Sequence, residues 1–111
     1  MALALQICVA CLGPGRLGEV AAIERALASS DISGDADLHR IACGETCKSP
    51  ARLWLQSDGG ASYIFEGVDL DADRDDIMAT LRCYLASPKG WIEDARPCGR
   101  LRFCLTARVP A

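Results

Sequence analysis

The amino-acid sequence predicts an α/β fold built on one mixed β-sheet, and three observations carry that prediction. The chain has 111 residues, about half of them hydrophobic, which suits one compact domain with a single core. Apolar residues recur with period two in some segments and with period three to four in others, as in strands and helices. Two close pairs of cysteines each follow a strand-like run. We therefore expect strands and helices in the order β-α-β-β-β-α.

The first half of the chain predicts a β-α-β unit. Residues 3 to 9 alternate as a strand does, and residues 17 to 28 carry apolar side chains at helical spacing. A second short strand spans residues 38 to 42. Because a helix intervenes, the two strands should be parallel, and their carboxyl ends then lie at the same edge of the sheet. Neighbouring strands are about 4.8 Å apart, so the loops after them can meet if the strands are adjacent.

The second half predicts a hairpin followed by a helix. Residues 51 to 56 and 62 to 66 are strand-like, and the segment between them is rich in turn residues. Asp71 or Asp73 is expected to cap a helix that ends near Ala86, and a short helix is expected around residues 101 to 105. The prediction is one domain over residues 1–111, with a core at 3–86, a tail at 87–111 and a four-stranded mixed sheet. The order β-α-β-β-β-α, or its β-α-β-(loop)-β-β-α variant, is that of a minimal thioredoxin-like core.

Charge and cysteine content exclude several classes of function. The net charge of -3, the sequence pI near 5.0 and the absence of a basic run argue against nucleic-acid binding. No apolar run reaches the roughly 20 residues needed to span a bilayer, and the amino terminus lacks a positively charged n-region. We therefore expect a cytoplasmic protein, where seven cysteines indicate metal or redox chemistry. We find no paired acid and base, no nucleophile with its base and no phosphate loop, and so expect no enzyme.

Four cysteines form the candidate site: Cys8 and Cys11 after the first strand, and Cys43 and Cys47 after the second. Four thiolates suit either an iron–sulfur cluster or tetrahedral zinc, and the spacing alone does not decide between them. They could also be small buried residues, or a dithiol oxidoreductase site with Pro50 just before the third strand. The dithiol interpretation is weakened because Leu-Gly-Pro-Gly, and not a helix that would lower a thiol pKa, follows Cys11.

Over nearly its whole length, the chain resembles a bacterial family of predicted metal-binding proteins that is similar to thioredoxin-like 2Fe-2S ferredoxins. The matching features are Ile7-Cys8-Val9-Ala10-Cys11, Cys43-Gly44-Glu45-Thr46-Cys47-Lys48, Tyr63-Ile64-Phe65 with Gly67 and Asp69, and the ending from Arg96-Pro97 to Ala107-Arg108-Val109-Pro110. The resemblance implies a ferredoxin-like domain in which Cys8, Cys11, Cys43 and Cys47 hold a 2Fe-2S cluster for electron transport. In those ferredoxins the first two ligands stand much farther apart, so Cys11 is the ligand to test first.

The remaining candidates are assigned to structural roles. Cys83, Cys98 and Cys104 have no close cysteine partner in the sequence and are expected to be small buried residues, although the tail could supply a replacement ligand. His39, the only histidine, is expected to be packed or solvated, with a lesser prospect of a cluster or zinc role because it precedes Cys43 by four residues. The resemblance also implies an unidentified redox protein as partner and leaves a homodimer open.

Overall fold

The computed structural model describes residues 3–10, 12, 14–42 and 51–110. In chain order, the elements are β1 (Leu3–Cys8), η1 (Pro14–Arg16), α1 (Leu17–Ala28), β2 (Ala36–Ile41), β3 (Arg52–Ser57), β4 (Ser62–Glu66), α2 (Arg74–Ala86), η2 (Pro88–Gly90), η3 (Arg96–Phe103) and β5 (Leu105–Val109). The η elements are 3-10 helices. The first helix and the fourth strand have the bounds that the sequence predicted, and the second strand begins two residues earlier.

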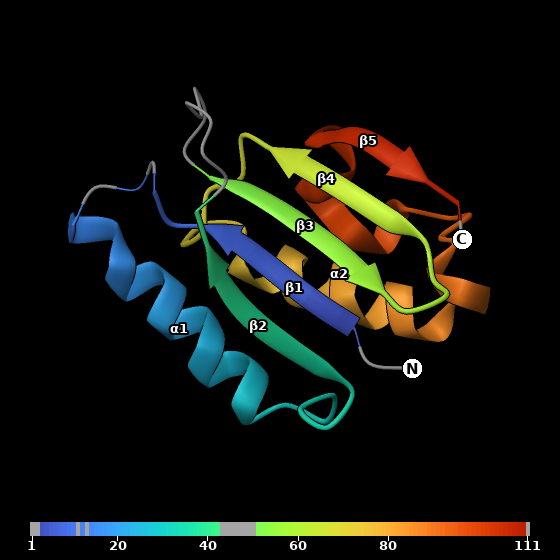
Figure 1. Ribbon diagram of the computed structural model, residues 1–111, viewed down its shortest axis with the longest axis horizontal. Helices are drawn as coiled ribbons and strands as arrows, with labels where there is room; N and C mark the ends of the chain where they lie inside the picture. Colours follow the sequence, from blue (N-terminus) through green and yellow to red (C-terminus); the bar gives the residue numbers. More distant parts are fainter. Residues whose placement is uncertain (1–2, 11, 13, 43–50, 111) are drawn as a thin grey trace.

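The strands form one mixed sheet in the order β2-β1-β3-β4-β5 (Figure 1). β1 and β2 are parallel, as the β-α-β pattern predicted. β3 is antiparallel to β1, and β3 and β4 form the predicted antiparallel hairpin. The carboxyl ends of β1 and β2 therefore lie at the same edge of the sheet as the amino end of β3.

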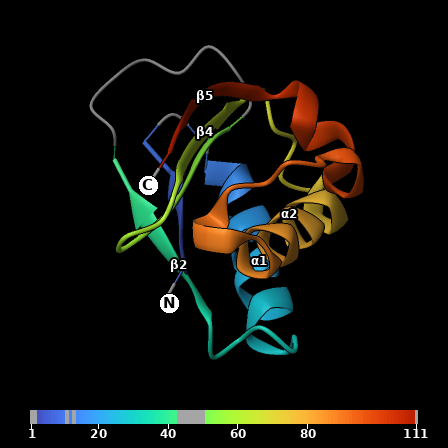
Figure 2. The ribbon, with the colours of Figure 1, turned by 90° about the vertical axis from the view of Figure 1, so that its right-hand side faces the viewer.

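Both α-helices cover the same face of the sheet (Figure 2). α1 buries Val20, Ile23 and Leu27, which its apolar stripe presents at intervals of three and four residues. The strands bury alternate side chains against the helices, since successive side chains point to opposite faces. The buried set includes Leu3, Leu5 and Ile7 of β1, Leu53 and Leu55 of β3, Tyr63 and Phe65 of β4, and Ile77, Leu81 and Tyr84 of α2.

The sheet has five strands, so the prediction of four strands was wrong. The additional strand, β5, pairs antiparallel with β4 at the edge of the sheet. Its sequence mixes Thr106 and Arg108 with apolar residues, and four of its five side chains are exposed. An edge strand of this kind lacks the apolar alternation that identifies a half-buried strand. The helix expected around residues 101 to 105 is instead η3, which begins at Arg96 and ends at Phe103.

The tail is fastened to the sheet by two buried tyrosines. The Tyr63 hydroxyl accepts a hydrogen bond from the backbone N–H of Ile92 at 2.8 Å and donates one to the carbonyl of Gly90 at 2.6 Å. Tyr84 packs edge-on against Tyr63, with ring centroids 5.8 Å apart. Gly90 has φ of 73° and lies so close to the Tyr84 ring that a Cβ atom would not fit. Burial raises the pKa of Tyr63, so its hydroxyl remains protonated as a donor.

Candidate metal centre

The first part of the candidate centre is the edge of the sheet where β1 and β2 end. Cys8, the last residue of β1, is in register with Ile41, the last residue of β2. The backbone N–H of Val9 donates a hydrogen bond to the carbonyl of Ile41 at 2.8 Å, so the pairing continues just beyond the strands. The side chain of Cys8 is buried, with the residue 1% exposed. The structure thus confirms that the two strands are neighbours and end together.

The same edge is where the chain enters β3. Leu53 of β3 is paired with Ile7 of β1, and Arg52 begins β3 one residue earlier. The last described residue after β2 is Ala42, and the chain is described again from Ala51. β2 and β3 lie on either side of β1, the strand that ends in Cys8. Ala42 therefore follows one neighbour of β1, and Ala51 precedes the other. We call the part of the sheet formed by Cys8, Ile41 and Arg52 the cysteine edge.

Of the four predicted ligands, the structure describes only Cys8. Cys11, Cys43 and Cys47 lie outside the described residues, as does Pro50, on which the dithiol oxidoreductase interpretation drew. Among residues 3–10, 12, 14–42 and 51–110, no three His, Cys, Asp or Glu side chains gather as a metal-ion site. The four-cysteine set therefore stays a prediction, with one member placed at the cysteine edge.

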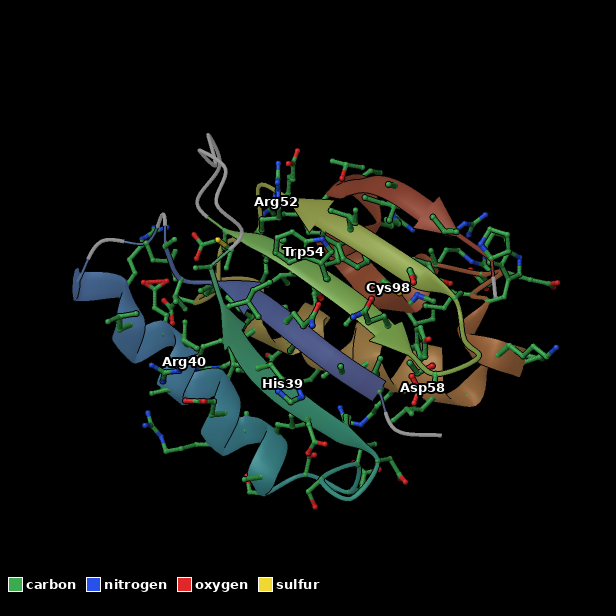
Figure 3. All side chains as sticks on the ribbon, in the orientation of Figure 1. His39, Arg40, Arg52, Trp54, Asp58 and Cys98 are labelled. Carbon is green, nitrogen blue, oxygen red and sulfur yellow. The ribbon has the colours of Figure 1, made fainter. Side chains whose placement is uncertain are left out.

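Charged and aromatic side chains lie beside the cysteine edge, and the sequence interpretation missed them. Arg52 forms an ion pair with Glu66, its cross-strand partner on β4. The Arg52 guanidinium also lies 5.7 Å from the centre of the Trp54 ring (Figure 3). The sequence did contain a signal for this ion pair: an arginine lies at the start of one strand of the hairpin, and a glutamate lies at the end of the other. A cation near a thiol favours the thiolate, the form that binds metals.

His39 lies on β2 opposite Gln6 of β1, and its side chain is exposed. Because the next-but-one pair along these strands is Cys8 with Ile41, His39 shares a sheet face with Cys8. His39 also borders a shallow groove of about 370 Å³. Asp58 and residues at the opposite end of β1 line the same groove. Figure 3 shows Asp58 at the end of the sheet away from Arg52. The exposed position agrees with the prediction of a solvated histidine.

The cysteines of the second half belong to α2, to η3 and to the residue after η3. Cys104 lies close to the end of β4, where its carbonyl accepts a hydrogen bond from the N–H of Glu66 at 2.9 Å. Cys98 and Cys104 are 3% and 6% exposed within the hydrophobic core, as predicted. Cys83 is half-buried and packs against that core. Burial raises the pKa of Cys104, and burial together with the neighbouring Cys98 raises the pKa of Cys83 to about 11. Burial in an apolar environment disfavours the thiolate form of Cys83 and Cys104.

Comparisons with known proteins give a family and no function. No helix in the part of the chain that the structure describes has the length and apolar character needed to cross a membrane. Searches against curated proteins and against solved structures found no match. A family model described as "Protein of unknown function (DUF1636)" matches residues 15–111. Because that match covers most of the chain, the protein belongs to the DUF1636 family.

Proposed function

We propose that the protein is a small electron-transfer protein that binds a 2Fe-2S cluster through Cys8, Cys11, Cys43 and Cys47. The observation that carries the proposal is the convergence of strand ends at the cysteine edge. β1 ends in Cys8, and Cys11 follows three residues later in the sequence. The segment with Cys43 and Cys47 leaves β2 and enters β3, the two strands that flank β1. All four cysteines are thus tethered to one edge by short lengths of chain.

The chemistry of the donor set fits this cofactor. Four cysteine thiolates are the usual ligands of a 2Fe-2S cluster. When bound, such a cluster accepts and donates single electrons. The burial of Cys8 would keep water from its sulfur. Burial, hydrogen bonding and local charge are the levers by which a protein sets the potential of a cluster.

A thioredoxin-like core is part of the same proposal. It is supported by the order of the elements through α2, which follows the predicted β-α-β-β-β-α pattern apart from short 3-10 turns. The strands of that core are β2-β1-β3-β4, with β1 and β2 parallel and the other pairs antiparallel. β5 would then be an addition at the outer edge of β4.

A zinc-binding or metal-delivery module is the second candidate, because four thiolates also make a closed tetrahedral zinc site. The dithiol oxidoreductase has less support. Its first thiol needs a helix N-terminus close by to lower its pKa, and α1 begins at Leu17, six residues after Cys11 in the sequence. The proposed partner is a redox protein that exchanges electrons at the cysteine edge.

The colour and metal content of the full chain separate these candidates. Protein purified without air should be red-brown, absorb visible light and contain iron and acid-labile sulfide in equal amounts. Colourless protein with stoichiometric zinc would favour the second candidate, and metal-free protein with disulfide-exchange activity the third. Protein that stays colourless and free of iron after anaerobic reconstitution with iron and sulfide would refute the proposal.

Single Cys→Ser variants assign the ligands. Replacement of Cys8, Cys43 or Cys47 should abolish or change the visible spectrum, and Cys11→Ser is the variant to examine first. Cys104→Ser is the matched control, because Cys104 is a buried cysteine that is not among the four proposed ligands. An unchanged spectrum in Cys11→Ser would remove that residue from the ligand set and leave one ligand to be found elsewhere.

A further inference from the structure

The outer edge of the sheet at β5 is the second surface of interest. β5 is the last strand of the sheet, and in the described part of the chain no further strand pairs with its outer side (Figure 1). An edge strand leaves a row of backbone N–H and C=O groups without partners in the sheet. Natural proteins protect such edges with charged side chains or covering elements, because an open edge pairs readily with another chain.

The opposite edge of the sheet, β2, is protected in this manner. Its side chains Asp37, His39 and Arg40 are exposed. Arg40 also forms an ion pair with Glu24 of α1 at 2.6 Å. Charged groups therefore accompany this edge, and burying it against another chain would require their desolvation.

The edge at β5 exposes apolar side chains instead. Of the four large hydrophobic side chains that are exposed in the described residues, three lie in β5 or just before it. Phe103 is 75% exposed, Leu105 36% and Val109 57%. Exposed apolar side chains that gather in one place mark an interaction surface. The two edges of the sheet thus differ in the surface that they offer to another chain.

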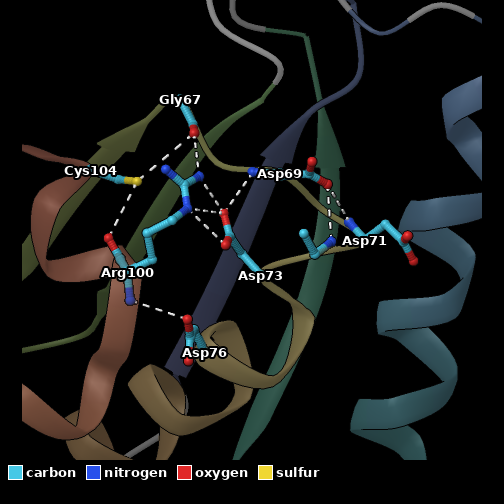
Figure 4. A network of polar contacts seen from close by, with 8 residues as sticks. Gly67, Asp69, Asp71, Asp73, Asp76, Arg100 and Cys104 are labelled. Carbon is cyan, nitrogen blue, oxygen red and sulfur yellow. Dashed lines mark hydrogen bonds and ion pairs between the residues drawn. The ribbon is translucent and has the colours of Figure 1, made fainter.

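The chain that leads into β5 is anchored to α2 by the polar network in Figure 4. The guanidinium of Arg100 in η3 pairs with the carboxylate of Asp73 and donates to the carbonyl of Gly67 at 2.7 Å. The backbone N–H of Arg100 donates to the Asp76 carboxylate at 3.1 Å. The charge of Arg100 is therefore engaged within the fold.

Two other arginines at this edge are not neutralised in that way. Among the residues that the structure describes, neither Arg102 nor Arg108 forms an ion pair with a carboxylate. The Arg102 guanidinium lies 4.7 Å from the centre of the Phe103 ring, and that of Arg108 lies 3.9 Å from the centre of the Trp91 ring. Residues 96 to 109 contain four arginines and no acidic residue. The region around β5 therefore favours a negatively charged partner.

The same two arginines line a small cavity of about 50 Å³ on the helix side of the sheet. Leu105 lines it as well, and it pairs with Phe65, whose side chain is buried against the helices. Most of the other lining residues are buried and apolar. The helix side of this edge thus combines an apolar interior with two exposed cations.

We propose that the outer edge of β5 binds an acidic, extended segment of a partner protein, which adds a sixth strand to the sheet. The backbone groups of the segment pair with those of β5, as in other cases of strand addition. Successive side chains of the segment point to opposite faces. Carboxylates on the helix side meet Arg102 and Arg108, and apolar side chains on the other face lie beside Ala107 and Val109. The inference goes beyond the proposed cluster and does not require it.

A second copy of the chain does not fit this edge. Opposite residues of an antiparallel pair lie on the same face of a sheet. Two β5 strands centred on Ala107 would place Leu105 opposite Val109, yet these side chains lie on different faces, because the register with β4 shifts between them. Centring the pair on Arg108 would place two guanidinium groups opposite each other. A partner of different, acidic chemistry avoids both conflicts.

The test measures how a fluorescein-labelled peptide of alternating glutamate and valine binds to the full chain, by fluorescence anisotropy. One control peptide has lysine in place of glutamate, and another keeps glutamate but has N-methyl groups on alternate backbone nitrogens. Both controls should bind at least about tenfold more weakly, since one loses the charge complementarity and the other the backbone pairing. The acidic peptide should also slow amide hydrogen exchange in residues 105–109.

Variants of the protein locate the binding surface. Arg102→Glu should weaken binding of the acidic peptide by at least about tenfold. Arg96→Glu is the matched control, because it reverses the same charge in the same 3-10 helix at a residue that does not line the cavity. Circular dichroism verifies that both variants fold.

Three outcomes would overturn the proposal. The first is that the acidic peptide does not bind, and the second is that its N-methylated form binds equally well. The third is a dimer in light scattering that Val109→Lys dissociates, because the edge would then belong to a second copy. None of these measurements uses the visible spectrum that tests the cluster, so the two proposals can fail separately.

Discussion

The cysteines of this chain fall into two groups in different parts of the molecule. Cys8 ends a strand at the cysteine edge, and the other three predicted ligands belong to the segments that follow β1 and β2. Cys83, Cys98 and Cys104 belong to α2 and the turns after it, where they pack within or against the core. One group of cysteines is thus linked in the sequence to the ends of two strands, and the other lies where helices pack on the core.

This difference explains why the two groups should differ in chemistry. Thiols in an apolar layer lose the solvation of their charged form, and the pKa values of Cys83 and Cys104 are raised accordingly. Cys8 instead lies where β1 and β2 end together and β3 begins. Metal binding is therefore expected at the cysteine edge, and structural roles for the cysteines of α2 and η3.

The largest expected effect comes from exchanging one cysteine of each group for serine. Cys8→Ser should remove most of the bound iron and the visible absorption, because a serine hydroxyl is a much weaker ligand than a thiolate for this cluster. Cys104→Ser should retain both. Iron analysis and visible spectra of the two variants, with circular dichroism to verify folding, make the measurement. Equal iron content in the two would remove the distinction between the groups.

The next largest effect tests the close packing of the helical layer. Gly99→Ala should lower the free energy of unfolding by roughly 3 kcal/mol, since the new side chain faces an unfavourable φ and a collision with Asp76. Gly18→Ala is the matched control, because its Cβ would meet nothing within 4 Å in α1. That control should stabilise the protein by about 0.5 kcal/mol. Urea denaturation of both variants measures the contrast, and similar stabilities would contradict it.

A smaller effect is expected when the ion pair between η3 and α2 is broken. Arg100→Ala leaves the Asp73 side chain, 5% exposed, without its cation. The loss of stability should be smaller than for a fully buried pair, because the Arg100 side chain is 49% exposed. Arg96→Ala, which breaks an ion pair exposed on both sides, should lower stability by less than Arg100→Ala does. Denaturation midpoints that rank the variants in the reverse order would show that η3 is held by other contacts.

The smallest effect is a dependence of stability on acid. Hydrogen bonds from Arg100 lower the pKa of Asp73 in the folded protein. The stabilisation by ionised Asp73 is therefore complete above the pKa of the unfolded chain, about 3.9. It is lost as the pH falls through the lower pKa of the folded protein. Denaturation midpoints of Asp73→Asn should lack this part of the acid dependence, whereas those of Asp75→Asn should keep it. Parallel acid profiles for the unaltered chain and Asp73→Asn would assign the effect to other carboxylates.

Most of the fold could be predicted from local patterns. The period of apolar residues placed α1 and β4 correctly and indicated that β1 and β2 are parallel. β5 could not be predicted in this way, because an exposed edge strand has no apolar face to reveal it. Its place is set by backbone pairing with β4, which is a contact between distant parts of the chain.

The candidate site, too, could be predicted from the sequence only in part. The sequence supplied the identity of the four cysteines and the inference that their segments follow neighbouring strands. It did not reveal the ion pair of Arg52 with Glu66 at the cysteine edge, since that pair depends on the register of the β3–β4 hairpin. Asp73 was predicted as a helix cap and does occupy the cap position, yet its carboxylate makes no capping bond and pairs with Arg100 instead.

The sequence by itself determined the elements whose causes are local: the alternating strands, the amphipathic helices and the cysteine spacings. Only the tertiary structure decided which residues meet across the fold, including Cys8 with the end of β2 and Asp73 with Arg100. The physical reason is that periodicity reports which face of an element is buried. Contacts between elements depend on register, on close approaches such as that of Gly99 to Asp76, and on buried charges finding partners.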